Sequence, residues 1–180
     1  DEGFTGYFRM LWMFEEITTD EAVNGWNDEG VNGLNYQTWT ASNSWVTYFY
    51  ARLYYQIALI NEFIREASDD KLDERGISGS DKEQVQLFKH EARLLRALSY
   101  YHALDFYANV PFVTEDDKVG AYLPEQISRA DLFDYIETEL LDLENLLAEP
   151  MTNDYGRVDK AVAWTLLAKL YLNAEVFANT

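Results

Sequence analysis

Cysteine is absent from this chain of 180 residues, and histidine is nearly absent, with two residues. A chain without cysteine has no disulfide, no zinc site with thiolate ligands and no cysteine nucleophile. His90 precedes Glu91, as in the helix of zinc proteases, but Leu94 stands four positions after His90, where the second histidine ligand belongs. We therefore expect His90 and His102 to be packing or surface residues, and we expect neither a metal site nor a cofactor.

Basic residues are scarce as well. The chain has 14 Lys and Arg against 32 Asp and Glu, for a formal net charge of -18. A field of this sign repels phosphate backbones and anionic lipid surfaces. No apolar run reaches the roughly 18 residues of a membrane-spanning helix, and no basic start leads into an apolar segment as in a signal peptide. These absences exclude nucleic acid as a partner and predict that this stretch of chain does not itself enter a membrane.

The many acidic residues form no recognisable catalytic or calcium site. Residues 69–74 fail the calcium-loop template, because Lys71 and Glu74 occupy its third position and its glycine position. The acidic run 115–117 is either a cation site or a solvated run of charge, and we expect the second. No pair of carboxylates is singled out for glycoside hydrolysis, and there is no Gly-rich phosphate loop or nucleophile elbow. We therefore expect no catalytic residues and no enzyme activity.

Apolar residues are plentiful, and over most of the chain they follow helical spacing. They make up 48% of the residues, which suits one globular domain or part of a larger one. Recurrence at intervals of three and four residues predicts amphipathic helices and an all-α fold. We expect helices near residues 4–17, 45–67, 80–107, 128–147 and 158–176.

Several of these helices have a defined apolar face. The expected faces are Phe4, Tyr7, Phe8, Leu11 and Phe14 in the first helix, Trp45, Phe49, Leu53, Ile57, Ile60 and Ile64 in the second, and Leu132, Ile136, Leu140, Leu143 and Leu147 in the fourth. On the fourth helix we expect the acids to face water, Glu139 among them. The starting signals are the cap at 42–44, the capping box at 80–83 and Ser128 with Asp131.

The connecting segments are predicted from turn residues and charge. We expect the segment 68–79 to be a connector, 111–124 an irregular crossover and 150–156 a turn. The helix before the crossover has apolar residues on all sides in its second half, so it must be buried among neighbours. We expect it to stop at residues 108–109, where Asn109 can adopt a left-handed conformation, before Pro111 bars further helix. The stretch 156–174 has the same all-round apolar character.

A short pattern recurs in three helices. An apolar residue, Ala and Tyr occur at the same offsets around Ala51, Ala97 and Ala168. We interpret the Ala as a point of close helix approach and the Tyr as filling the adjoining groove. Ala168 follows Ala97 by about two of the 34-residue units of a tetratricopeptide solenoid. This spacing, together with the helix lengths, predicts tetratricopeptide-like helical hairpins in an α/α superhelix.

The loop at residues 20–41 is the candidate binding site. It contains Gly and Asn residues interleaved with aromatic ones, a pattern that fits neither helix nor strand. Sugars present an apolar face and a rim of hydroxyls, so a site for them needs an exposed aromatic ring beside amides or carboxylates. Trp26, flanked by Asn24, Asn27 and Asp28, offers that set. The alternative is that Trp26 anchors its own loop to the helices, as we expect of the tryptophans at 39 and 45.

Three stretches of the sequence carry a family resemblance. They are Glu-Ala-Arg-Leu-Leu-Arg-Ala at 91–97, Tyr-Ala-Asn-Val-Pro-Phe-Val at 107–113, and Gly-Arg-Val at 156–158 with Ala-Lys-Leu-Tyr-Leu at 168–172. Residues 19–21 and 61–64 also match family positions. The chain thus resembles the SusD/RagB family of outer-membrane nutrient-binding lipoproteins over nearly its whole length. Ala108 departs from the family, which often has Gly there.

The resemblance implies a helical scaffold at the outer-membrane surface that docks on a SusC-like TonB-dependent transporter and helps to pass glycans to it. It implies a lipid anchor on an N-terminal cysteine outside this chain. It further implies that residues 1–180 are the N-terminal part of a larger single domain, with much of the ligand-binding surface elsewhere. The segment 26–30 resembles a loop whose aromatic residues form the sugar platform in the family's glycan binders.

Three functions remain open at this stage. The first is a non-catalytic binding protein for an oligosaccharide or another nutrient. The second is a tetratricopeptide-type scaffold that binds only protein, in which the loop 20–41 is structural. The third is a glycosidase, although no acid pair is marked for it. Retention of a glycan without cleavage would favour the first function, and cleavage of the glycan would favour the third. If the protein neither retains nor cleaves a glycan, the second function is favoured.

Overall fold

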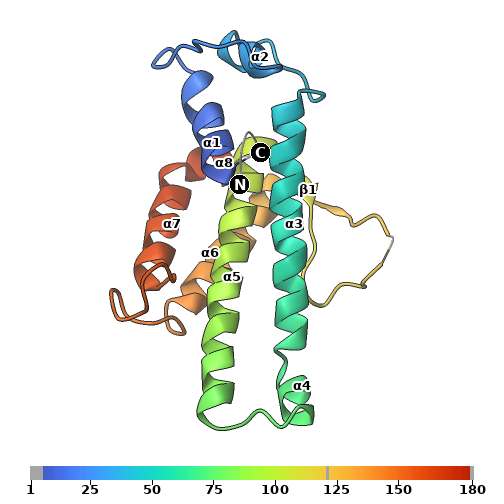
Figure 1. The fold of residues 1–180 in the computed structure, drawn as a ribbon, viewed down its shortest axis with the longest axis vertical. Helices are drawn as coiled ribbons and strands as arrows, with labels where there is room; N and C mark the ends of the chain where they lie inside the picture. The colour runs from blue at the N-terminus through green and yellow to red at the C-terminus, as the bar shows by residue number, and fades with distance from the viewer. Residues whose placement is uncertain (1–5, 121, 179–180) are drawn as a thin grey trace. The chain divides into compact units, whose positions relative to one another are not determined.

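The computed structural model describes residues 6–120 and 122–178, and it confirms the all-α prediction (Figure 1). Strands in this part of the chain are limited to β1 and β2, two residues each, which pair antiparallel. The chain forms two compact units, Asp1–Tyr55 and Gln56–Thr180. The elements are α1 (Tyr7–Trp12), the π-helix η2 (Met13–Ile17), α2 (Val31–Asn35), α3 (Ser44–Glu66), α4 (Asp69–Glu74), α5 (Ser80–Tyr107), β1 (Val110–Pro111), β2 (Gln126–Ile127), α6 (Arg129–Leu143), α7 (Lys160–Leu172) and α8 (Ala174–Ala178).

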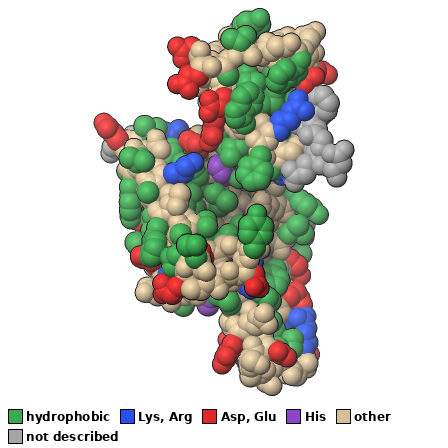
Figure 2. Space-filling view, turned by 60° about the vertical axis from the view of Figure 1, so that its left-hand side comes forward, with side chains coloured by type: hydrophobic (Ala, Val, Ile, Leu, Met, Phe, Trp, Pro, Cys, Tyr) green, Lys and Arg blue, Asp and Glu red, His purple; other side chains and the backbone are tan. Residues whose placement is uncertain are grey.

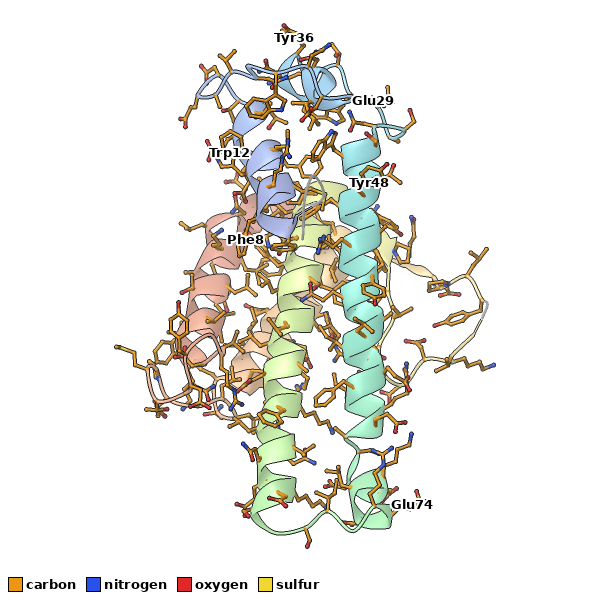
Figure 3. The ribbon with its side chains drawn as sticks, in the orientation of Figure 1. Phe8, Trp12, Glu29, Tyr36, Tyr48 and Glu74 are labelled. Atoms are coloured by element: carbon orange, nitrogen blue, oxygen red, sulfur yellow. The ribbon has the colours of Figure 1, made fainter. Side chains whose placement is uncertain are left out.

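In the first unit, α1 and η2 bury a different face from the predicted one. The buried residues are Met10, Met13 and Ile17, whereas Phe8 is 79% exposed and projects from the helix (Figure 3). The reason is that this helix has two apolar faces, and the row of Met and Ile also steps by three and four residues. Phe4 lies outside the described residues.

The loop 20–41 contains one short helix that the sequence reading missed. Val31 and Leu34 are buried one helical turn apart in α2, which corrects the expectation that no helical period fits this segment. Gly30 precedes the helix with φ +83°, and a Cβ there would lie 2.9 Å from Cδ1 of Trp45. Glycine is therefore required at this position, both for its backbone conformation and for the close approach of Trp45.

The apolar face predicted for α3 is confirmed, because all six of its residues from Trp45 to Ile64 are buried. The cap predicted at 42–44 is confirmed, and its residue is Asn43. Oδ1 of Asn43 accepts a hydrogen bond from the backbone N–H of Trp45 at 2.9 Å, whereas the hydroxyl of Ser42 pairs with that of Thr40 at 2.8 Å. Asn is as good a capping residue as Ser, so any residue of 42–44 could have been the cap on sequence grounds.

In the second unit, α4 joins α3 to α5 at one end of a hairpin (Figure 1). The expected connector thus contains a helix, held by the buried Leu72. The predicted capping box is wrong, because Ser80 already lies within α5 and no side chain caps the helix. Its N-cap residue is Gly79, which has φ +60°, a conformation that glycine adopts at little cost.

The second half of α5 is the core of this unit, as predicted. Its buried residues include Leu94, Ala97, Tyr100 and Leu104, and His102 is buried among them. Burial and the positive charge of Lys169 lower the pKa of His102 to about 4, so its imidazole is neutral at pH 7. His102 is therefore a packing residue.

The helix α6 packs along α5 and confirms most of its predicted face and start. The five predicted apolar residues are buried, although α6 ends at Leu143 and Leu147 lies beyond it, earlier than the predicted end at 147. Ser128 Oγ accepts a hydrogen bond from the N–H of Asp131. One acid does not face water: Glu139 is held by Arg93 through contacts of 2.9 and 3.1 Å, with its side chain 16% exposed. The cause is a long-range partner that helical periodicity does not reveal.

The end of α5 corrects the prediction about Asn109. Ala108, not Asn109, has the positive φ of +61°, with ψ -97°. The side chain of Asn109 instead accepts a hydrogen bond from the N–H of Arg129 at 2.8 Å. The crossover therefore leaves at β1 and returns at β2, where Val110 pairs with Ile127.

The predicted last helix is two helices, α7 and α8, because Asn173 interrupts it. It begins at Lys160, later than predicted, since Asp159 is the N-cap residue. Ala168 and Ala51 are exposed, so of the three recurring alanines only Ala97 is buried as expected. Helical spacing predicted three equivalent alanines, but only the alanine on α5 is buried against other parts of the protein.

One side of α7 is apolar and exposed, which corrects its all-round burial. The inner face consists of Ala163, Leu166, Leu167 and Leu170, whereas Trp164, Tyr171 and Leu172 are 44%, 47% and 84% exposed. Figure 2 shows hydrophobic side chains gathered on the surface of the molecule where α7 lies.

Candidate functional site

The candidate site loop, residues 20–41, is held by hydrogen bonds among its four asparagines. The side chain of Asn24 accepts from the N–H of Trp26 at 3.2 Å and donates to its carbonyl at 2.5 Å. The Asn24 amide also donates to Asn32 at 2.8 Å, and its backbone N–H donates to Asn35 at 3.4 Å. The backbone of Trp26 is therefore fixed at both of its polar groups, before any ligand is present.

Trp26 is 47% exposed, so about half of the residue is open to solvent. Oδ1 of Asn27 accepts from Asn32 at 2.6 Å. Within residues 6–120 and 122–178, Nδ2 of Asn27 makes no hydrogen bond, which leaves that donor for a ligand hydroxyl. Asn24, by contrast, uses its amide to shape the loop, so it positions Trp26 and is less suited to bind a hydroxyl itself.

Asp28 is oriented by a cation from α1. Nη2 of Arg9 lies 2.9 Å from Oδ2 of Asp28, and the Asp28 side chain is 25% exposed. The same guanidinium lies over the ring of Trp45 at 5.4 Å. The second carboxylate oxygen of Asp28 is thus the group that remains for a ligand, next to Asn27 in the sequence.

The loop is anchored by Trp45, as the sequence predicted. Its indole Nε1–H donates to the carbonyl of Glu29 at 2.8 Å, and the residue is 4% exposed. Asn43 donates to the carbonyl of Gly30 at 2.9 Å. Trp39, expected to anchor the loop in the same way, is 44% exposed. Both tryptophans of the loop, Trp26 and Trp39, are therefore half-exposed, and the buried tryptophan that holds the loop is Trp45 on α3.

A hollow of about 510 Å³ lies at the two ends of the loop. Its lining residues are Thr19, Asp20, Ala22, Val23, Asn35, Tyr36 and Gln37. The hollow is not lined by the predicted site residues, which are Trp26, Asn24, Asn27 and Asp28. Tyr36 is 72% exposed, and Figure 3 shows it on the outer side of the loop.

This hollow was missed by the sequence reading. The available signal was the pair of loop ends, where Asp20 and the Asn-Tyr-Gln run at 35–37 place an aromatic ring beside polar side chains. Nothing in the sequence showed that these ends meet. Their contact depends on Gln37, which has φ +54° and donates from Nε2 to the carbonyl of Thr18 at 2.7 Å.

The site's chemistry is that of a binding surface. Half-exposed indole and phenol rings stack on the C–H faces of sugars, and adjacent amides and carboxylates bind hydroxyls. In the described part of the chain, no group of three His, Cys, Asp or Glu is placed to hold a metal ion. None of the helices there is both long and apolar enough to cross a membrane.

The sequence is similar to those of known proteins. A family model described as starch-binding and associating with the outer membrane matches residues 7–172. The starch-binding protein SusD of Bacteroides thetaiotaomicron is 32% identical over 180 residues, which cover 99% of this chain and 30% of SusD. The chain thus spans about a third of the length of that relative.

Solved structures share the fold. A surface glycan-binding protein A from Bacteroides fluxus matches with a TM-score of 0.76 and 19% identity, over 98% of this chain and 37% of that protein. A SusD-like carbohydrate-binding protein from Bacteroides fragilis matches with a TM-score of 0.69 and 22% identity, over 95% and 32% of the two chains. The fold, the matched family model and the SusD relative agree with the resemblance seen in the sequence. The chain therefore belongs to the SusD-like family.

Proposed function

We propose that the intact protein binds an oligosaccharide without cleaving it, through the loop 20–41. The observation that carries this proposal is the pre-formed setting of Trp26, whose backbone is fixed by Asn24 while 47% of the residue stays exposed. A ring that is already ordered loses little conformational freedom when a sugar stacks on it. Its neighbours Asn27 and Asp28 each keep a polar atom for hydroxyl groups.

The hollow beside Tyr36 extends the proposed surface. Tyr36 offers a second exposed ring, and Asp20 and Gln37 line the same hollow. An extended glycan has repeated apolar faces, so two platforms on one loop suit it better than a single sugar. SusD, the relative named as a starch-binding protein, supports a glucan as the first ligand to test.

The partner and the location are proposed from the family. The family model's description associates it with the outer membrane, which supports a place at that membrane for the intact protein. We propose a SusC-like TonB-dependent transporter as the partner, as the family resemblance implies. Co-purification of the intact protein with the transporter encoded beside it tests this part, and separation of the two at low detergent would contradict it.

The runner-up function, a protein-binding scaffold, is favoured by one observation. The exposed side of α7 carries Trp164, Tyr171 and Leu172, and exposed apolar surface of this kind marks interaction sites. This face belongs to the second unit and the loop 20–41 to the first, so the two functions use different residues and are compatible.

The experiment that separates these functions uses the intact protein and maltoheptaose, a starch fragment. Retention of maltoheptaose on the protein with no shorter products is expected. Shorter products would instead indicate a glycosidase. Absence of binding to maltoheptaose and to a panel of other glycans would leave the scaffold function.

A further inference from the structure

The second unit contains a hollow of about 410 Å³ that is distinct from the loop site. Its lining residues are Ile64, Arg65, Ser68, Lys71, Lys89, Glu115 and Asp116. They come from the end of α3, from α4 and its N-cap residue Ser68, from α5, and from the crossover after β1. The volume lies in the range of small-molecule sites, which is about 300–1,000 Å³.

Three cations converge on this hollow in a chain with few cations. Arg65, Lys71 and Lys89 line it, although the whole chain has 14 basic residues against 32 acidic ones. They are brought together from three helices by the α3–α4–α5 hairpin, so the cluster is a product of the fold. Glu115 and Asp116 line the hollow as well, so the lining carries three cations and two acids in a chain with a formal net charge of -18.

Two of the three cations have acidic partners outside the lining. Nε of Arg65 lies 2.9 Å from Oε2 of Glu62, and Lys71 pairs with Glu66. Lys89 differs, because no acid in the described part of the chain forms an ion pair with it. Lys89 is half-buried, so its ammonium group is the one available to a ligand.

The acids in the lining do not neutralise Lys89. Burial raises the pKa of Glu115, but the hydrogen bond and charge of Arg96 outweigh this, so the net pKa lies below its ordinary value. The Glu115 carboxylate is thus ionised and turned toward Arg96, which is 2% exposed. Its backbone carbonyl accepts from Nη1 of Arg65 at 3.0 Å, which fixes the crossover against α3. Asp116 is exposed.

We propose that this hollow binds the anionic group of a small acidic sugar, a uronate carboxylate or a sulfate ester, which pairs with Lys89. Lys71 and Arg65 reinforce the positive field, and the hydroxyl of Ser68 is a neutral hydrogen-bonding group for the sugar ring. That the ligand is a sugar rests on the proposed function, whereas the preference for an anion rests on the lining alone.

The test is calorimetric titration of the intact protein with glucuronic acid, glucose 6-sulfate, inorganic sulfate and glucose. The two acidic sugars are expected to bind and glucose is not. Glucuronate binding over glucose 6-sulfate indicates a carboxylate site, and the reverse indicates a sulfate site. Binding of inorganic sulfate as tight as that of glucose 6-sulfate would overturn the sugar part of the inference. Binding of glucose as tight as that of glucuronic acid would overturn the anion preference.

Charge variants identify the hollow as the place of binding. Lys89→Gln is expected to weaken binding of the preferred acidic sugar about tenfold, equivalent to about 1.4 kcal/mol, and Lys89→Arg to restore most of it. Lys118→Gln is the matched control, because it removes the same charge from an exposed crossover residue outside the lining. An equal loss in both Gln variants, or no loss in Lys89→Gln at an unchanged melting temperature, would overturn the inference.

Failure of this inference is distinguishable from failure of the proposed function. Trp26→Ala is expected to leave binding of the acidic sugar unchanged, since Trp26 lies in the other unit. Binding of neutral glycans without binding of acidic sugars removes only the present inference. Binding of acidic sugars without binding of any neutral glycan removes only the loop site.

Discussion

Arg96 on α5 donates a hydrogen bond from Nη1 to Oδ1 of Asn61 on α3 at 2.8 Å, and both residues are at most 3% exposed. Asn61 in turn donates from Nδ2 to the carbonyl of Val113 at 3.1 Å. The hydroxyl of Tyr100 donates to the same carbonyl at 2.7 Å and accepts from the Val113 N–H at 2.9 Å. A buried cation thus connects two helices and the crossover that follows β1.

Glu115→Ala should destabilise the protein, because it removes the nearest carboxylate from buried Arg96. Breaking one side of a buried ion pair costs about 3–5 kcal/mol. We expect about 3 kcal/mol, since Glu139 remains 3.8 Å from Arg96 and offsets part of the loss. Urea denaturation of the intact protein measures this. Glu62→Ala is the control, because its pair with Arg65 is exposed and should contribute less than about 1 kcal/mol.

The same pair makes stability depend on pH. The folded pKa of Glu115 is below its ordinary value, because the hydrogen bond and charge of Arg96 outweigh the effect of burial. A lowered folded pKa stabilises the protein above the unfolded pKa of about 4.3, and this contribution is lost as pH falls through the folded pKa. Glu115→Gln should therefore lose less stability than the parent between about pH 5 and pH 3. Parallel losses for the two proteins in urea titrations would contradict this assignment.

Ala108→Gly should stabilise the protein. Ala108 has φ +61° and ψ -97°, a conformation that costs a residue with a Cβ about 1–3 kcal/mol and glycine much less. The greater conformational freedom of glycine in the unfolded chain lowers the free energy of unfolding by about 0.4–1 kcal/mol. The net stabilisation expected is therefore about 1 kcal/mol. Thermal and urea unfolding both measure it. Ala92→Gly in the interior of α5 is the control and should lose about 1 kcal/mol.

Leucine at two recurring alanines should have opposite outcomes. Ala97 is 1% exposed, so Ala97→Leu should overpack the core and cost roughly 1–3 kcal/mol. Ala168 is exposed on α7, so Ala168→Leu should change stability by less than about 0.5 kcal/mol. Melting temperatures of the two variants check the difference. Equal losses would show that Ala168 also lies at a helix crossing in the intact protein.

Much of the fold could be predicted from the local spacing of apolar residues. On α3, side chains three and four residues apart must share one face, so Trp45, Phe49 and Leu53 could be assigned to the core without any tertiary information. The Ser128 cap was equally local, since its partner Asp131 is three residues away. Spacing failed at α1, where two faces were apolar and the choice between them depended on neighbours.

Less of the site could be predicted from the sequence, because its geometry depends on contacts between residues that are far apart in the sequence. Trp26 and its polar neighbours were visible as a cluster in the sequence, but the link from Arg9 to Asp28 spans 19 residues. The bond between Arg96 and Asn61 spans 35 residues, and no pattern along either helix indicated it. The positive φ of Ala108 was also not predicted from the sequence, because its neighbour Asn109 has the higher propensity for a left-handed conformation.

Trp26 in the loop and Trp45 on α3 should respond differently to truncation. Trp45 is 4% exposed and hydrogen-bonded, so Trp45→Ala should cost about 3–5 kcal/mol. Trp26 is 47% exposed, so Trp26→Ala should cost less than about 1 kcal/mol. Comparison of the two unfolding curves decides whether Trp26 is free to serve a ligand. A loss at Trp26 as large as that at Trp45 would make it a loop anchor.

The most direct measurement is the dissociation constant of the intact protein and its Trp26→Ala variant for a glycan that the parent retains, beginning with maltoheptaose. Stacking and area burial of about 1.4 kcal/mol predict binding about tenfold weaker in Trp26→Ala at nearly unchanged stability. Tyr36→Ala, tested in parallel, reports on the hollow at the loop ends. Equal dissociation constants for the parent and Trp26→Ala would contradict the platform at Trp26.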